Sequence, residues 1–403
     1  MLDFYSASSG AVNSRRAMAE CLETALAETG GTDCDILVFH TTVGHQFAEL
    51  LSEAHKLAPS ATIVGCTCHG VVGREGANEN MRGLAIMAIR GPRSEWAVAH
   101  VDNIRGANSF EQSVQLGQQL KAQTPNITSV CLLASGIDIA ADRAIEGIES
   151  VLGPDIKIFG GTSSDNMRAI RTFQFYGDQI LERAALAIGF ADPTLHIEMA
   201  VHHGSIPVGN PFVVTRSEAN HVFELDGRPG WHVLMDQLGK PQNSHPGPMI
   251  PIAGLGVELP ASLQVENDNP HILRVVAKTD PDGSFYLPVD VPVGTRVWLM
   301  ERDEHLIFDG LSRMMKRLLE RIAGKQVVAV FHTDCAARGR ALFSRILKEE
   351  IVGRMQAPIC GEQPIPWLGM YGFGEFTQLG GRNFFHNYTT SLYCLCRAKP
   401  SAS

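Results

Sequence analysis

The strongest constraint in this sequence is a succession of elements that occurs three times: an apolar strand, an amphipathic helix, a second strand, and a glycine-rich polar turn. The first copy runs from a strand at 35–42 to a turn at 66–70, the second from 129–134 to 161–165, and the third from 327–332 to 371–375. Copies that are roughly 100 residues or more apart are too long for the units of a solenoid. The pattern therefore predicts duplicated α/β units.

The strands of these copies are almost continuous apolar runs, which is typical of strands covered on both faces. The chain has 403 residues, of which 44% are hydrophobic, enough for two or three domains with large cores. We predict an α/β fold of two domains built from duplicated strand-helix-strand units on mixed sheets. The first domain spans 1–208 and holds two repeats, the second spans 209–397, and 398–403 form a frayed tail.

Three local assignments follow from the same patterns. The apolar run at 195–201 is expected to complete the second copy, as a strand after the one at 184–190. The Pro- and Gly-rich stretch at 241–260 predicts a long loop, and such loops are usually functional or mobile. The run at 384–395 predicts one strand, with Cys394 and Cys396 on the same face because their spacing is two.

The charge balance excludes two classes of partner. With 34 Lys and Arg against 43 Asp and Glu, the formal charge is −9, which disfavours nucleic acid and a polybasic membrane contact. No run approaches the ~18 apolar residues of a membrane span, and the first residues do not resemble a signal peptide, so we expect a cytoplasmic protein. The nine cysteines form no disulfide spacing and are expected to be reduced.

The three polar turns are the first place to look for a ligand site. Each follows the carboxyl end of a strand, where ligands collect in open α/β sheets. The simpler interpretation is that glycine closes these turns and that Ser and Asp cap them. The candidate ligand-binding residues in the turns are Cys66, Thr67, Thr162, Ser163, Ser164, Asp165, Tyr371 and Glu375.

The loop after the strand at 327–332 supplies charged candidates. A zwitterionic ligand needs a fixed cation for its carboxylate and an anion for its ammonium, and Arg338 with Asp334 and Glu375 meets that need. The alternative is an internal ion pair that holds the loop on the sheet. Cys335, three residues after His332, is a further candidate because a neighbouring His can activate a thiol, although this pair requires a turn between them.

Established catalytic and metal motifs are missing from the sequence. It has no complete Gly-x-Gly-x-x-Gly, Walker A, His-Glu-x-x-His or Gly-x-Ser-x-Gly pattern. Cys66-x-Cys68-His69 lacks a second ligand pair at zinc-site spacing, so we predict no metal. No catalytic residue is assigned, and a non-enzyme is expected. The enzyme alternative places chemistry at Asp334, Cys335, Arg338, Glu375 and His386.

Several of these segments together resemble the FIST family, with both its N and C halves, over roughly 10–397. The resemblance is carried by the order of the motifs rather than by one of them. The motifs are Ile63 to His69, Phe159 to Asp165, Asn220 to Pro229, Asp334 to Gly339, Gly372 to Glu375, and Phe385 to Thr389, which adds His386 and Asn387 to the candidate residues.

The resemblance implies a sensory, ligand-binding module of signal transduction. The family is described as sensing small molecules such as amino acids and acting with signalling proteins such as histidine kinases, and a homodimer is compatible with this role. One branch, NosP, binds haem and senses nitric oxide. In that alternative the cofactor is haem b, held without covalent attachment, and an axial histidine lies beside an apolar cavity. The candidate axial ligands are His203, His232, His245 and His386.

Overall fold

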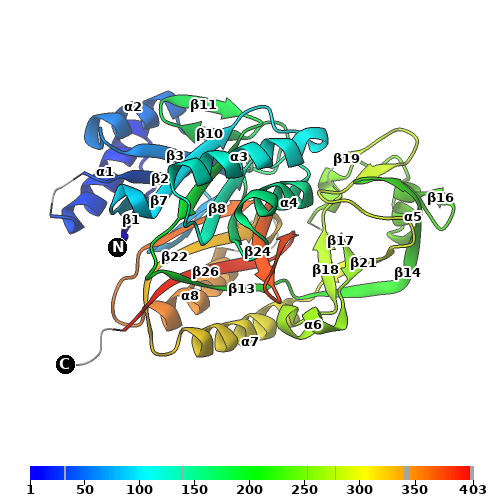
Figure 1. The fold of residues 1–403 in the computed structure, drawn as a ribbon. Helices are drawn as coiled ribbons and strands as arrows, with labels where there is room; N and C mark the ends of the chain where they lie inside the picture. The colour runs from blue at the N-terminus through cyan, green and yellow to red at the C-terminus, as the bar shows by residue number, and fades with distance from the viewer. Residues whose placement is uncertain (31–32, 138, 252, 277, 340–344, 400–403) are drawn as a thin grey trace.

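Three α/β units form the body of the molecule, and a smaller, mainly β domain is inserted in the third unit (Figure 1). This computed structural model describes residues 1–403 except 31–32, 138, 252, 277, 340–344 and 400–403, and the side chains of 345–348 also lie outside the description. The prediction of an α/β fold of duplicated units on mixed sheets is confirmed. The division at residue 208 stays a prediction.

Each unit contributes four strands to its own sheet, and the second and third of these in chain order pair in parallel. A hairpin of two further strands comes between the third and the fourth strand. Unit 1 consists of β1 (Asp3–Ser9), α1 (Ser14–Glu28), β2 (Ile36–Thr42), α2 (Phe47–Leu57), β3 (Thr62–Cys68), the hairpin β4 (Val71–Gly73) and β5 (Gly76–Asn78), and β6 (Leu84–Arg90). Unit 2 consists of β7 (Trp96–Val101), α3 (Ser109–Gln123), β8 (Ser129–Ala134), α4 (Ala141–Leu152), β9 (Lys157–Thr162), the hairpin β10 (Phe173–Tyr176) and β11 (Gln179–Glu182), and β12 (Ala185–Phe190). Unit 3 consists of β13 (His196–His202), α7 (Glu304–Ile322), β22 (Lys325–Cys335), α8 (Arg345–Cys360), β23 (Trp367–Gly372), the hairpin β24 (Gly374–Leu379) and β25 (Arg382–His386), and β26 (Thr390–Ala398).

The hairpins are exchanged in a circle. The hairpin of unit 1 pairs with β23 of unit 3, that of unit 2 with β3 of unit 1, and that of unit 3 with β9 of unit 2. Each of the three sheets therefore has six strands, of which two come from another unit. Sequence patterns cannot reveal this exchange, because a short strand carries no signal for the edge on which it pairs. As a consequence, the polar turns of all three units lie close to one another.

Helices cover the outer faces of the sheets, and the inner faces pack together. Buried residues of all three units share one central core, which includes Phe4, Cys66, Phe159, Phe331 and Tyr393. Three further cores lie between each sheet and its own helices. The strands are therefore buried on both faces, as their apolar runs predicted.

The inserted domain occupies the chain between β13 and α7 (Figure 1). It has its own core around Trp231, Leu255 and Phe285. Its elements are β14 (Ser205–Glu218), β15 (His221–Leu225), β16 (Arg228–Pro229), α5 (Gly230–Gln237), β17 (Ala253–Glu258), α6 (Ala261–Asn267), β18 (His271–Arg274), β19 (Lys278–Thr279), β20 (Phe285–Tyr286) and β21 (Arg296–Arg302).

Three local assignments need correction. The run at 195–201 does not complete the second copy, because β13 pairs along its length with β26 and so begins unit 3. The stretch at 241–260 is not wholly a loop, because β17 pairs there with β18 and β21. The run at 384–395 is broken at 387–389, where Tyr388 has a φ of 62°, although Cys394 and Cys396 do share one core.

The last residues that the structure describes belong mostly to a strand. The predicted frayed tail begins within β26, whose last residue is Ala398, and its final four residues, 400–403, lie outside the described chain. Within the described ranges, the helices lack the combination of length and apolar character that a membrane crossing requires.

Candidate functional site

The candidate site lies where the two parallel strands of unit 3 end. Asp334 on β22 and Tyr371 on β23 are opposite each other in the parallel register, at the carboxyl edge of the sheet. Both side chains are buried. In open α/β sheets, ligands bind in the crevice outside the carboxyl ends of the strands.

Arg338 returns over Asp334 by means of a single 3₁₀ turn, Ala336–Arg338. Its Nε donates to Asp334 Oδ1 at 2.9 Å, and its Nη1 donates to the carbonyl oxygen of His203 at 3.0 Å. The third nitrogen, Nη2, is buried and has no hydrogen-bond partner among the described residues. Arg338 is only 3% exposed and Asp334 2%. The ion pair that the alternative interpretation proposed is therefore present, but it leaves one charged donor unused.

Glu375 is a second buried charge with unused capacity. It is on β24, and its Oε2 accepts from Thr389 Oγ1 at 2.6 Å, while Oε1 is buried without a partner in the described chain. Burial raises the pKa of the Glu375 carboxyl well above its ordinary value; Asp334 acts in the same direction, whereas Thr389 and Arg338 lower it. The side chain therefore retains its proton to a higher pH than an exposed glutamate.

His386 lies opposite Glu375 in the β24–β25 hairpin. It is fully buried, and neither Nδ1 nor Nε2 has a partner in the described ranges. Burial lowers the pKa of its imidazole well below the ordinary value, and the positive charge of Arg274 adds to the effect. His386 is therefore neutral, with a ring nitrogen that can accept a hydrogen bond and another that can donate one.

Unit 1 contributes a residue that the sequence analysis missed. Glu79 follows the exchanged hairpin of unit 1 and lies against Gly70 and Gly339, where an added Cβ would come within 2.4 Å and 2.7 Å of its atoms. His69 Nε2 is 3.4 Å from Glu79 Oε2, and both residues are buried. The only signal in the sequence was the glycine at each of the two contact points, and that signal required knowledge of the hairpin exchange.

Of the four candidates in unit 2, three use their side chains in hydrogen bonds within the protein. Ser163 Oγ donates to the Ala134 carbonyl oxygen at 3.1 Å, and Ser164 Oγ donates to the Tyr371 carbonyl oxygen at 2.7 Å. Asp165 accepts three backbone N–H groups of the loop that follows it, from residues 169, 170 and 171. Thr162 Oγ1 is buried without a described partner. Ser164 thus connects unit 2 to the site, and Asp165 serves as a loop cap.

The other candidates, Cys66, Thr67, Asn387 and Cys335, are packed in the core or hydrogen-bonded within the protein. Cys66 faces the central core, with its sulfur 3.5 Å from Met370 Sδ, and Thr67 Oγ1 accepts from the Phe173 N–H at 3.0 Å. Asn387 accepts from Val275 N at 3.2 Å and donates to the Phe373 carbonyl oxygen at 3.0 Å. Burial raises the pKa of the Cys335 thiol well above its ordinary value, and Glu375 adds to the effect, so the thiolate needed for nucleophilic chemistry is disfavoured.

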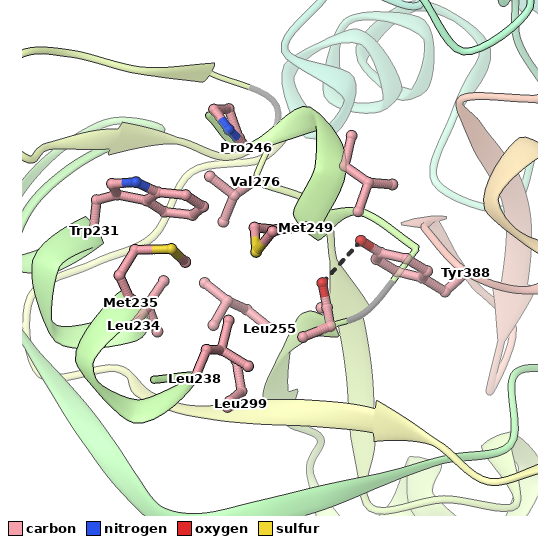
Figure 2. Close-up of a pocket in the computed structure, with 13 residues that line it drawn as sticks. Trp231, Leu234, Met235, Leu238, Pro246, Met249, Leu255, Val276, Leu299 and Tyr388 are labelled. Carbon is pink, nitrogen blue, oxygen red and sulfur yellow. Dashed lines mark hydrogen bonds between the residues drawn. The ribbon is translucent and has the colours of Figure 1, made fainter. Parts of the chain in front are cut away.

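Haem binding in the predicted form requires one of the four candidate histidines beside an apolar cavity. The inserted domain has an apolar pocket that is also lined by Tyr388 of unit 3, which donates to the Ala253 carbonyl oxygen at 3.3 Å (Figure 2). Its 13 lining residues include no histidine. His203 uses both ring nitrogens in hydrogen bonds, His245 is exposed, His232 is half-buried on α5, and His386 lies among polar groups. These residues do not fit haem beside an apolar cavity.

Metal binding has no support in the described part of the chain, where no three His, Cys, Asp or Glu side chains are grouped to hold an ion. What the site offers is a buried set of polar and ionisable side chains from units 1 and 3. We call this set, Glu79, Asp334, Arg338, Tyr371, Glu375 and His386, the strand-end cluster.

Comparisons with known proteins find relatives that match nearly the whole chain. A relative in Mycobacterium tuberculosis strain H37Rv, described as uncharacterized, is 25% identical over 384 residues, which cover 94% of this chain and 95% of that protein. An uncharacterized protein of Mycobacterium bovis is 22% identical over 383 residues, with the same coverage of both chains. A crystal structure of a cyanuric acid hydrolase from A. caulinodans aligns over 99% of this chain and 100% of its own, at a TM-score of 0.40 and 8% identity.

Two family models match the chain in sequence order. The FIST N domain matches residues 35–228 and the FIST C domain matches residues 248–378. These matches confirm the family that the order of the motifs predicted. FIST domains are sensory domains of signal transduction. The chain belongs to the FIST family.

Proposed function

We propose that this protein is a non-enzymatic sensor that binds a small zwitterionic ligand, of the amino-acid class, at the strand-end cluster and relays its presence to a signalling protein. One observation carries the proposal: Arg338 Nη2 and Glu375 Oε1 are buried atoms of opposite charge type, and neither has a partner among the described residues. A buried charged group without a partner costs free energy, and a ligand that supplies the partner recovers it.

The roles of the two groups follow from their chemistry. The Arg338 guanidinium is fixed by Asp334 and by the His203 carbonyl oxygen, so its free nitrogen can receive a ligand carboxylate without further loss of side-chain freedom. Glu375 is fixed through Thr389 and offers its free oxygen to an ammonium. Burial raises the pKa of Glu375, and a bound ammonium favours the carboxylate form, so ligand binding is expected to lower that pKa again.

The relay requires that the ligand bind two conformations with different affinity. The turn at 387–389 is suited to this role because it touches both the cluster and the inserted domain. Thr389 hydrogen-bonds Glu375, while Tyr388, at a φ of 62°, packs on Gly254 of β17. A partner such as a histidine kinase would bind with an affinity that depends on the position of the inserted domain.

The test is a thermal-shift screen of amino acids on the full chain, followed by calorimetric titration of each compound that stabilises it. Arg338→Lys keeps the charge but loses the planar donor set, and we expect at least tenfold weaker binding. Arg397→Lys is the matched control, because Arg397 also forms a buried pair, with Asp192 at 2.9 Å, remote from the cluster. Equal loss in both variants, or no stabilising amino acid in the screen, contradicts the proposal.

An absorption spectrum of the same preparation, with and without added haem and nitric oxide, tests the haem alternative. We expect no Soret band, because the candidate histidines do not fit a haem site. A band that disappears in His386→Ala would replace the amino-acid proposal by a gas-sensing one.

A further inference from the structure

A second pocket lies at the end of β8 in unit 2, away from the strand-end cluster. It has a volume of about 310 Å³ and lies between the end of β8 and the base of the exchanged hairpin β10–β11. A volume of this size is within the range of small-molecule sites, about 300–1,000 Å³.

The floor of this pocket carries two buried hydroxyl groups with unused hydrogen-bonding capacity. Ser135 and Thr172 line it and are 2% and 3% exposed. Their oxygens are 3.5 Å apart, at the outer limit of a hydrogen bond, and no other bond to either hydroxyl is formed within the described chain. Buried hydroxyls are normally satisfied, so both are suited to a ligand oxygen.

The walls of the pocket carry charged side chains, which are those of Arg171, Arg183 and Glu182. Arg171 Nε donates to Glu182 Oε2 at 3.2 Å, and its Nη2 also contacts that carboxylate. The Arg171 side chain is 60% exposed, so its guanidinium stays accessible to an oxyanion that enters the pocket.

The pocket is held open before a ligand arrives. Asp165 fixes the wall that ends in Arg171 by accepting three backbone N–H groups, at 2.7, 2.7 and 2.9 Å. The carbonyl oxygen of Arg183 accepts from Ile104 N at 2.7 Å, and Arg183 itself has a φ of 55°. A site that is rigid in this way loses little conformational entropy on binding.

In unit 3 the position equivalent to this pocket is filled by packed side chains. Cys335 follows Asp334 as Ser135 follows Ala134, in equivalent registers, and it is packed in a cluster with Ala337, Tyr388 and Trp298. We infer that the unit 2 pocket is a second ligand site, which takes a compact oxyanion, a carboxylate or a phosphate of a small polar molecule, on Arg171, Ser135 and Thr172. This site is independent of the function proposed for the strand-end cluster.

The experiment is calorimetric titration of the full chain with inorganic phosphate and, separately, with acetate, at low ionic strength. We expect saturable binding of at least one anion, weakened at least tenfold by Arg171→Gln and severalfold by Thr172→Val, which removes the hydroxyl at constant shape. The anion that binds more tightly, phosphate or acetate, shows whether the site takes a phosphate or a carboxylate. Binding must be unchanged in Arg338→Ala, which disables the other site.

Arg216→Gln is the matched control for Arg171→Gln. Arg216 is 59% exposed, is paired with Glu224 at 3.0 Å, and lies over the Phe223 ring at 4.6 Å, whereas Arg171 is 60% exposed, is paired with Glu182, and lies over Phe173 at 5.2 Å. The proposal is overturned if neither anion binds at about 10 mM, a concentration well above a millimolar Kd. It is also overturned if Arg216→Gln weakens binding as much as Arg171→Gln does.

Discussion

Units 2 and 3 have the same strand order and register, yet they place different chemistry at the same positions. Ala134 on β8 and Asp334 on β22 are equivalent, and so are Gln174 and Glu375 on the exchanged hairpins. Gln174 uses both ends of its amide, donating to Ser163 Oγ at 2.6 Å and accepting from Ala184 N at 3.0 Å. Glu375 keeps one buried oxygen without a described partner.

This difference separates residues that hold the fold from residues that are available to a ligand. In unit 2 a neutral amide satisfies its neighbours and completes the packing. In unit 3 charged groups replace neutral ones and keep some of their hydrogen-bonding capacity unused. Such local departures from full satisfaction are expected at functional sites and are compensated elsewhere in the structure. Substitutions that copy one unit into the other test the distinction directly.

Asp334→Ala, which gives unit 3 the residue of unit 2, is expected to have the largest effect. It leaves the Arg338 guanidinium buried without its carboxylate, and removal of one partner of a buried pair costs about 3–5 kcal/mol. Urea unfolding measures the loss.

Two controls accompany this variant. Asp334→Ala with Arg338→Leu should regain much of the stability, because an apolar pair carries no uncompensated charge. Asp192→Ala, which breaks the other buried pair with Arg397, should cost a similar amount while leaving ligand affinity unchanged. A full loss of stability in the double variant would mean that Asp334 acts through packing rather than charge.

The sequence indicated much of this fold, and its limits are physical. The apolar runs and helical spacings identified the three units, because a strand that is buried on both faces consists almost entirely of consecutive apolar residues. The charged residues Asp334, Arg338 and Glu375 were also found, since they lie next to glycine turns at strand ends. Glu79 was not found, because its place depends on which sheet edge the hairpin of unit 1 pairs with. The assignment of β13 failed for the same reason.

Gln174→Glu, the reverse exchange, is expected to cost about 1–3 kcal/mol at pH 8. It removes the donor to Ser163 and buries a carboxylate in a position that is fully enclosed. A buried carboxyl prefers to be protonated, so the cost should become smaller at pH 5. Thermal unfolding at the two pH values checks this. A cost that does not depend on pH would show that shape, not charge, decides between the amide and the acid.

Glu375→Gln should have a smaller effect of opposite sign. Burial raises the pKa of Glu375 above its value in the unfolded chain, so the stability that this group contributes is present below pH 4.5 and is lost as the pH rises through the folded pKa. The variant lacks this loss and is expected to exceed the wild type by about 1 kcal/mol at pH 8, with no difference near pH 4. The same variant should bind amino acids more weakly. Stabilisation together with lost binding is the pattern of a group kept for a ligand.

The smallest expected effect concerns Arg171 and Arg216, which have similar surroundings but different proposed roles. Both form exposed ion pairs, and such pairs contribute about 0–1 kcal/mol, so Arg171→Gln and Arg216→Gln should each change the free energy of unfolding by less than about 0.5 kcal/mol. Urea titrations in about 0.1 M salt measure the two changes side by side. Because stability then distinguishes neither residue, a difference in anion affinity between the two variants can only come from the pocket beside Arg171. A large loss of stability in Arg171→Gln alone would instead make this arginine a structural part of the hairpin base.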